Sequence, residues 1–154
     1  MHSLYVMRHG QAEGSAPSDE LRALTPLGVQ EVTLNSQNVL SGKEFDYVFV
    51  SPYLRAQQTW EAVLKNSVKY KRCQTVEWVT PDVSTQPILD ELIALEGESI
   101  SVLIVCHQTF AGRLVTHLCG GPKHGIHIDT ASIAHIEAEV FAAQCGTLIN
   151  IYSD

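Results

Sequence analysis

The feature that most constrains the fold is the alternation of short apolar runs with longer segments of helical period. The runs are Leu4–Met7, Asp46–Val50 and Ser101–Cys106, and each is followed by residues that suit a helix. Apolar side chains in continuous runs, rather than at every second position, are typical of strands buried on both faces of a parallel sheet. Strands that alternate with helices predict an α/β fold.

The segments between the runs predict the helices. Pro26–Leu40 follows Thr25, a suitable N-cap, and proline is favoured at a first helical position. Its predicted inner face consists of Val29, Val32, Ser36, Val39 and Leu40. Further helices are expected over 53–66, 85–97 and 109–121. A third strand, half polar, is expected at Thr75–Val79, and a closing hairpin of two strands at 131–140 and 146–152.

Length and charge limit the class of protein. A chain of 154 residues suits one domain, which we expect to span residues 1–154 as a mixed, mostly parallel sheet of about six strands between two layers of helices. The net charge of −7 argues against nucleic-acid binding. The first residues have no basic leader, and their apolar run is too short for a membrane span, so we expect a cytoplasmic protein that does not bind membranes.

The four cysteines are widely scattered and show no spacing typical of a zinc site. We therefore interpret Cys73, Cys106, Cys119 and Cys145 as reduced core thiols. The pair His124 and His127 has a spacing that suits a metal on a helix, but glycine and proline predict a loop there, so no metal is expected. Without an obvious apolar seam, a monomer is the default.

Polar groups collect where the predicted strands end. Arg8 and His9 follow the first apolar run, Arg55 lies in the helix after the second, and His107 follows Ser101–Cys106. Ligands of open α/β sheets bind beyond the carboxyl ends of the strands. Each residue alone suits an ordinary solvated loop, but four donor groups at three strand ends indicate a pocket for a multiply charged anion. Phosphoryl is the obvious candidate because arginine matches its oxygens.

These motifs resemble the histidine phosphatase superfamily, which includes phosphoglycerate mutase. The resemblance is carried by MRHGQAE at 7–13, VFVSPYLRAQQTWE at 48–61 and LIVCH at 103–107. DELRALTPLGVQE at 19–31 is similar to a pattern of the small bacterial phosphohistidine phosphatases of the SixA kind, although Ala23 replaces its usual proline. The resemblance covers nearly the whole chain and implies a phosphoglycerate mutase-like fold.

The resemblance implies a role for each motif residue. His9 would attack phosphorus and form a covalent phosphohistidine, while Arg8, Arg55 and His107 would hold the phosphoryl oxygens, with no cofactor or metal. The resemblance also implies that a backbone carbonyl beside Gly10 accepts a hydrogen bond from one ring nitrogen of His9. The proton would stay on that nitrogen, and the second ring nitrogen would attack phosphorus. The remaining expected substrate-binding residues are Gly10, Gln11, Arg22 and Gln108, and Thr59 either touches the phosphate or fixes a turn.

Two roles stay open in the sequence. Glu77, Asp82 and Asp19 are candidates for a general acid, although ordinary solvated carboxylates are the simpler interpretation. Arg22 either lines the site or pairs with Asp19. Because a protonated imidazole leaves phosphohistidine with little help, the weak acid signal favours cleavage of a P–N bond.

The leading hypothesis is therefore a metal-independent phosphohistidine phosphatase. Its expected substrate is a phosphorylated protein, a histidine-containing phosphotransfer domain of a bacterial signalling relay, and this partner rests on the resemblance alone. One alternative is a phosphatase for small phosphate esters, and another is a non-catalytic module that binds phosphoproteins. An intact His9 argues against the module.

Overall fold

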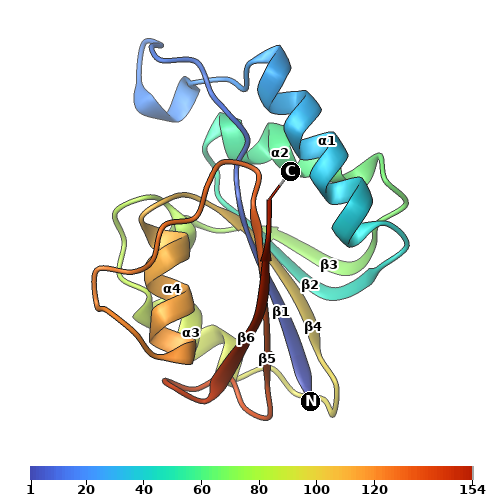
Figure 1. Ribbon diagram of the computed structural model, residues 1–154, viewed down its shortest axis with the longest axis vertical. Coiled ribbons are helices and arrows are strands. Elements are labelled where there is room, and N and C mark those ends of the chain that lie inside the picture. The colour runs from blue at the N-terminus through green and yellow to red at the C-terminus, as the bar shows by residue number, and fades with distance from the viewer. Residues whose placement is uncertain (154) are drawn as a thin grey trace.

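Backbone hydrogen bonds join six strands into one mixed sheet. The computed structural model describes residues 1–153, so Asp154, the last residue of the expected domain, lies outside the described residues. The strand order is β3-β2-β4-β1-β5-β6 (Figure 1). The strands are β1 (His2–Arg8), β2 (Glu44–Val50), β3 (Lys69–Thr75), β4 (Ser101–Cys106), β5 (Ile133–Ala138) and β6 (Gly146–Tyr152).

The first four strands run parallel, while β5 is antiparallel to β1 and β6 is antiparallel to β5. A parallel neighbour requires a long crossover connection, and a helix or a helical pair supplies each one. The last two strands need only a short turn, which confirms the expected closing hairpin. The three parallel strands β2, β4 and β1 are adjacent, so their carboxyl ends meet at one edge of the sheet.

Helices cover both faces of the sheet. Helices α1 (Pro26–Leu40) and α2 (Leu54–Leu64) lie on one face, and α3 (Gln86–Ile93) and α4 (Phe110–Cys119) lie on the other (Figure 1). Each central strand packs into both cores: Val6 lies in the core with α3 and α4, whereas Met7 lies in the core with α1 and α2. This two-sided burial explains the continuous apolar runs and confirms the three-layer α/β prediction. No helix within residues 1–153 has the length and apolar character needed to cross a membrane.

Helix α1 has the bounds and the cap that its sequence predicts. The Gly28 amide donates to Thr25 Oγ1 at 2.9 Å, which satisfies one free N–H of the first turn. Its inner face is wrong at Val29, which is 40% exposed. The helix instead buries Asn35, whose amide nitrogen donates to the Ala131 and Tyr152 carbonyls. These two hydrogen bonds to backbone carbonyls satisfy the buried amide of Asn35. The helix therefore buries the face that contains Asn35 and exposes Val29.

The third strand was misplaced by the sequence pattern. Strand β3 covers Lys69–Thr75, and Glu77–Val79, within the expected strand, forms a single 3₁₀ turn, η2. Every residue of β3 is exposed because the strand lies at the edge of the sheet, where it needs backbone partners but no apolar face. The charged side chains of this edge strand discourage pairing with another chain. The remaining expected helices are confirmed with shorter bounds.

The cysteines are free, but only Cys106 is a core residue. Cys119 is half-buried, while Cys73 and Cys145 are exposed, which corrects the expectation of four core thiols. Cys73 belongs to the exposed edge strand and Cys145 to the turn before β6, so neither has a second layer to cover it.

Candidate functional site

Backbone bonds beyond the strand ends bring the predicted site together. The His9 amide donates to Cys106 O at 3.0 Å, and the Ser51 amide donates to Val105 O at 3.1 Å. These bonds continue the sheet for one residue past β1 and β2, on either side of β4. As a result, the ring centroids of His9 and His107 are 5.1 Å apart.

His9 is held in one tautomer. Its Nδ1 lies 2.6 Å from Gly10 O, and because a carbonyl only accepts, Nδ1 carries the proton. Arg55 Nε donates to His9 Nε2 at 3.2 Å, so Nε2 carries the lone pair. The Gly10 amide in turn donates to Thr59 Oγ1 at 3.1 Å, which fixes the carbonyl that orients the ring. The ring therefore presents Nε2 as its nucleophilic atom.

The position of Gly10 has no room for a side chain. A Cβ there would lie 2.7 Å from both Gly28 O and the Val32 Cγ2 atom of α1. Close approach of α1 to the residues after β1 therefore requires a glycine at position 10. This contact is the physical reason for the glycine that follows His9.

The surroundings of His9 favour its neutral form. Burial is the main cause that lowers its pKa to about 4, with a further contribution from the cationic Arg55 and Arg8 and an opposing one from the bond to Gly10 O. The ring is 6% exposed. A histidine with this pKa is a free base at neutral pH and can attack an electrophile without first losing a proton.

Two buried side-chain nitrogens near His9 have no protein partner among the described residues. Arg8 donates through one terminal nitrogen to Ile128 O at 3.0 Å, but its Nε is buried and unpaired. His107 Nε2 lies 2.7 Å from Ser51 Oγ, and its Nδ1 is buried and unpaired. Burial, followed by the charge of His9, lowers the pKa of His107 to about 2. Unpaired buried groups cost free energy, so this site has hydrogen-bonding capacity for a ligand.

Arg55 links His9 to the segment that follows β1. It is buried, and its terminal nitrogens donate to Asp19 O at 2.7 Å and Asp19 Oδ2 at 3.2 Å. Asp19 Oδ1 also accepts from Arg22 at 3.0 Å. The bond to Arg22, followed by the bond and charge of Arg55, lowers the pKa of Asp19. Asp19 is therefore ionised, which makes it a poor general acid.

Arg22 pairs with Asp19, one of the two arrangements that the sequence left open. Its Nε also donates to Glu13 O at 2.6 Å, so the side chain braces the segment between β1 and α1. The positive charge of Arg22 nevertheless contributes to the low pKa of His9, which places it near the ring. A role in binding substrate stays a prediction.

The other predicted binding residues support the loops around the site. Gln11 is exposed, and its Oε1 accepts from Thr25 Oγ1 at 2.8 Å. Gln108 Nε2 donates to Ile126 O at 2.8 Å. Glu77 and Asp82 are exposed, and within residues 1–153 neither carboxylate is hydrogen-bonded to Arg8, His9, Arg55 or His107. Substrate contacts of these residues also stay predictions.

Two supporting features were missed by the sequence reasoning. Ser51, to which the sequence pattern assigned no role of its own, lies against His107. The loop before β5 closes the other side of the site, where the Ala131 amide donates to His9 O at 3.0 Å. A serine directly after a buried strand was an available signal for the first, whereas nothing in the local pattern indicated the second.

The described residues offer no metal centre. Within residues 1–153 no three His, Cys, Asp or Glu side chains lie close enough together to hold an ion. His127, one of the pair considered for a metal, is in a loop, where its Nε2 lies 2.7 Å from Asp129 Oδ1. The positive charge that the site offers an anion therefore comes from its arginines.

Known proteins share both the sequence and the fold. The model of the histidine phosphatase superfamily (branch 1) matches residues 4–76. The phosphohistidine phosphatase SixA homolog of Haemophilus influenzae is 33% identical over 143 residues, which are 87% of this chain and 87% of the relative. Phosphohistidine phosphatase SixA of Escherichia coli is 37% identical over 121 residues, which are 77% of this chain and 74% of the relative.

A solved structure agrees with these relatives. The protein histidine phosphatase SixA complexed with tungstate matches with a TM-score of 0.84 and 32% identity, over 98% of this chain and 96% of the other. The identity to the Haemophilus influenzae protein extends over most of both chains, and the fold agrees from β1 to β6. The chain therefore belongs to the histidine phosphatase superfamily and is SixA-like within it.

Proposed function

We propose that this protein is a phosphohistidine phosphatase that acts through a covalent intermediate on His9. The observation that carries the proposal is the neutral His9 ring with its Nε2 facing Arg55, surrounded by buried donors without partners. A multiply charged phosphoryl group satisfies such donors. The relatives that align with most of this chain are named phosphohistidine phosphatases, which supports the same substrate class.

The reaction follows from the tautomer of His9. Nε2 attacks phosphorus, a bond from Nε2 to phosphorus forms, and the P–N bond of the substrate breaks. The leaving imidazole takes the electron pair of that bond and departs neutral when its other nitrogen is already protonated. Arg55 Nε must leave Nε2 during this step, and it is close enough to move to a phosphoryl oxygen. Gly10 O stabilises the charged ring of the intermediate by accepting from Nδ1.

Water completes the cycle by attacking the phosphorus of the intermediate. The bond from phosphorus to Nε2 breaks, orthophosphate is released and the neutral His9 ring returns. Arg8, Arg55 and His107 stabilise the negative charge in both steps as preorganised donors. His107 suits this role in its neutral form with the proton on Nδ1. Ser51 Oγ already accepts from the Tyr53 amide, so its proton is available for His107 Nε2.

The lack of a placed general acid favours phosphohistidine over phosphate esters. An ester releases an alkoxide, which needs a proton, whereas imidazole leaves without one. Asp19 is ionised by its two arginine partners, and Glu77 and Asp82 are exposed and, within residues 1–153, have no hydrogen bond to the donor set. A small-ester phosphatase remains the second candidate because the donor set recognises any phosphoryl group.

We further propose a protein substrate, a histidine-containing phosphotransfer domain, and a cytoplasmic location. The segment between β1 and α1 contains only the short 3₁₀ turn η1 (Asp19–Leu21), so no inserted helical lid from it covers the pocket in the described residues. A site without such a lid suits a macromolecular substrate. The four free cysteines are typical of a reducing compartment.

The test compares substrates and variants under metal-free conditions. Purified protein with a chelator would receive a phosphorylated histidine phosphotransfer domain and, separately, p-nitrophenyl phosphate. We expect faster phosphate release from the phosphoprotein and an acid-labile label on the enzyme when the reaction is quenched early. His9→Ala should remove both, whereas His124→Ala, in an exposed loop, should keep them.

Other outcomes separate the alternatives. Release from the ester alone would refute the phosphohistidine substrate. Binding of the phosphoprotein without any release would indicate a binding module. Turnover by His9→Ala with an unchanged label would refute the nucleophile.

A further inference from the structure

A second cavity, away from His9, is lined by basic residues and by no acidic residue among those described. It has a volume of about 400 Å³ and lies between the start of α3, the outer part of α4 and the turn before β6. Its lining consists of Ser84, Thr85, Arg113, Thr116, His117, Gly121, Lys123 and Gln144. The volume falls in the range of about 300–1,000 Å³ that is typical of small-molecule pockets.

The charge of this lining is opposite to that of the whole protein. Three of its residues are basic and none of the described lining residues is acidic, although the chain has 17 acidic residues against 10 Lys and Arg. Anions are therefore repelled by most of the surface but not by this cavity. The basic groups also converge from separate segments, since Arg113 and His117 lie on α4 and Lys123 lies in the loop after it.

Two of the basic side chains are already oriented. Arg113 donates through Nε to Thr109 Oγ1 at 3.2 Å and through its terminal nitrogens to Val83 O at 2.9 Å and Pro81 O at 3.2 Å. These three bonds leave two of the five guanidinium N–H groups for a ligand. His117 Nδ1 lies 2.8 Å from Thr85 Oγ1, which fixes the ring and leaves Nε2 for a ligand.

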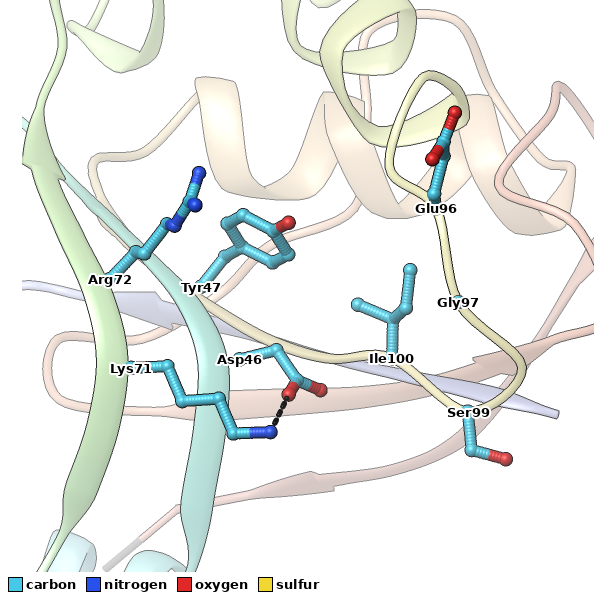
Figure 2. A pocket seen from close by; sticks show the side chains of 8 residues that line it. All are labelled: Asp46, Tyr47, Lys71, Arg72, Glu96, Gly97, Ser99 and Ile100. Atoms are coloured by element: carbon cyan, nitrogen blue, oxygen red, sulfur yellow. Dashed lines mark ion pairs between the residues drawn. The ribbon is translucent and has the colours of Figure 1, made fainter.

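Another cavity shows that such a lining is not general in this protein. It has a volume of about 200 Å³, and its lining residues come from β2, β3 and the segment before β4, at the opposite end of the parallel strands from His9. Two acidic and two basic residues line it, and Lys71 Nζ pairs with Asp46 Oδ1 at 2.9 Å (Figure 2). Its charges compensate one another, so it offers no comparable site for an anion.

From these observations we propose that the cavity of Arg113, His117 and Lys123 binds a phosphate group, either free or on a small organic molecule. Arginine and lysine supply charge, and the hydroxyls of Ser84, Thr85 and Thr116 supply further hydrogen bonds to its oxygens. The cavity is larger than one phosphate group needs, which leaves space for an organic portion. The proposal does not depend on the reaction at His9.

The test is a site-resolved titration of the full ¹⁵N-labelled chain. Orthophosphate and ribose 5-phosphate would be added separately, with ribose as the uncharged control, while amide resonances are followed by NMR. We expect saturable shifts of the Gly121 and Gln144 amides, which line this cavity, with either phosphate compound. Shifts of the Gly10 amide report the His9 site separately, so failure of one proposal is distinguishable from failure of the other.

A pair of variants tests the chemistry. Lys123→Glu reverses an exposed charge in the cavity and should weaken binding on the order of 10-fold, the loss expected for one charged hydrogen bond. Lys65→Glu makes the same change at an exposed position after α2 and should leave the affinity unchanged. Tighter binding of ribose 5-phosphate than of orthophosphate identifies an organic ligand, and the reverse identifies the free anion. Absent shifts at Gly121 and Gln144, or equal affinities of the two variants, would overturn the proposal.

Discussion

Arg55 donates through Nε to Nε2 of His9 across 3.2 Å, so the arginine that we propose to bind phosphate also contacts the atom that we propose as the nucleophile. The terminal nitrogens of Arg55 contact Asp19 at the same time. A phosphoryl group that binds to Arg55 at His9 must therefore partly replace this internal network. The consequences of this network can be measured.

Removal of Arg55 should have the largest effect of any single donor. Arg55→Ala should lower kcat/KM with a phosphohistidine protein by about 10²–10³, because a preorganised charge next to the reacting oxygen atoms is lost. Arg55→Lys should recover part of this loss, since it keeps the charge without the planar fork. Arg72→Ala, on the exposed strand β3, is the matched control. A loss below tenfold in Arg55→Ala would contradict the role.

As the pH is lowered, kcat/KM should begin to fall only at an unusually low pH. In the proposed mechanism the neutral form of His9 is the nucleophile, and because its pKa is about 4, kcat/KM should stay flat as the pH falls from 8 to about 5. An unperturbed histidine, with a pKa of about 6.5, would already lose about tenfold at about pH 5.5. The measurement uses initial rates corrected for spontaneous loss of the phosphate. An acid limb near 6.5 would contradict the lowered pKa of His9.

Stability should fall in mildly acidic solution. Burial lowers the pKa values of His9 and His107 below that of an unfolded histidine, so the unfolded chain binds these protons first. This stabilising contribution is complete above about pH 6.5 and is lost as the pH falls toward 4. Between pH 6.5 and 5 we expect a loss of about 2 kcal/mol for each histidine in urea unfolding. His107→Asn should reduce the pH dependence by about half, because it removes one of the two histidines with a lowered pKa.

The contact between α1 and the segment after β1 should tolerate no added methyl group. A Cβ at Gly28 would lie 2.1 Å from Gln11 O, so Gly28→Ala must shift the backbone two residues from His9. We expect a loss of about 1–3 kcal/mol in unfolding free energy and a parallel fall in kcat/KM. A Cβ at Gly14 meets nothing within 4 Å, which makes Gly14→Ala the control. Equal stability of both variants would contradict the packing argument.

Arg22 should matter less than Arg55. The Arg22–Asp19 pair is partly exposed, with side chains 31% and 52% accessible, and such pairs contribute about 0.2–1 kcal/mol. Arg22→Gln should therefore lower kcat/KM by less than tenfold. If the residue acts through Asp19, adding Asp19→Asn to Arg22→Gln should cost less than Asp19→Asn costs alone. Strict additivity of the two losses would show that Arg22 acts independently, as a residue that contacts substrate does.

The sequence by itself determined the layered fold and the four central groups of the site. Continuous apolar runs specify strands buried on both faces, and the carboxyl ends of adjacent parallel strands must meet, so Arg8, His9, Arg55 and His107 converge for topological reasons. Thr25 and Pro26 likewise specify the start of α1 locally. By contrast, hydrophobic periodicity did not locate β3, because an exposed edge strand has no buried face that requires apolar residues at regular positions.

Only the tertiary structure decided the details that depend on contacts between distant segments. Arg22 pairs with Asp19, Ser51 meets His107 from a neighbouring strand, and the loop before β5 closes on His9 O. The low pKa of His9 comes from burial that several elements share, and the basic cavity joins α3, α4 and the turn before β6. Hydrogen bonds and desolvation depend on the distance between groups in space. The amino-acid sequence predicts that distance only within a helix or strand, where the backbone geometry is regular.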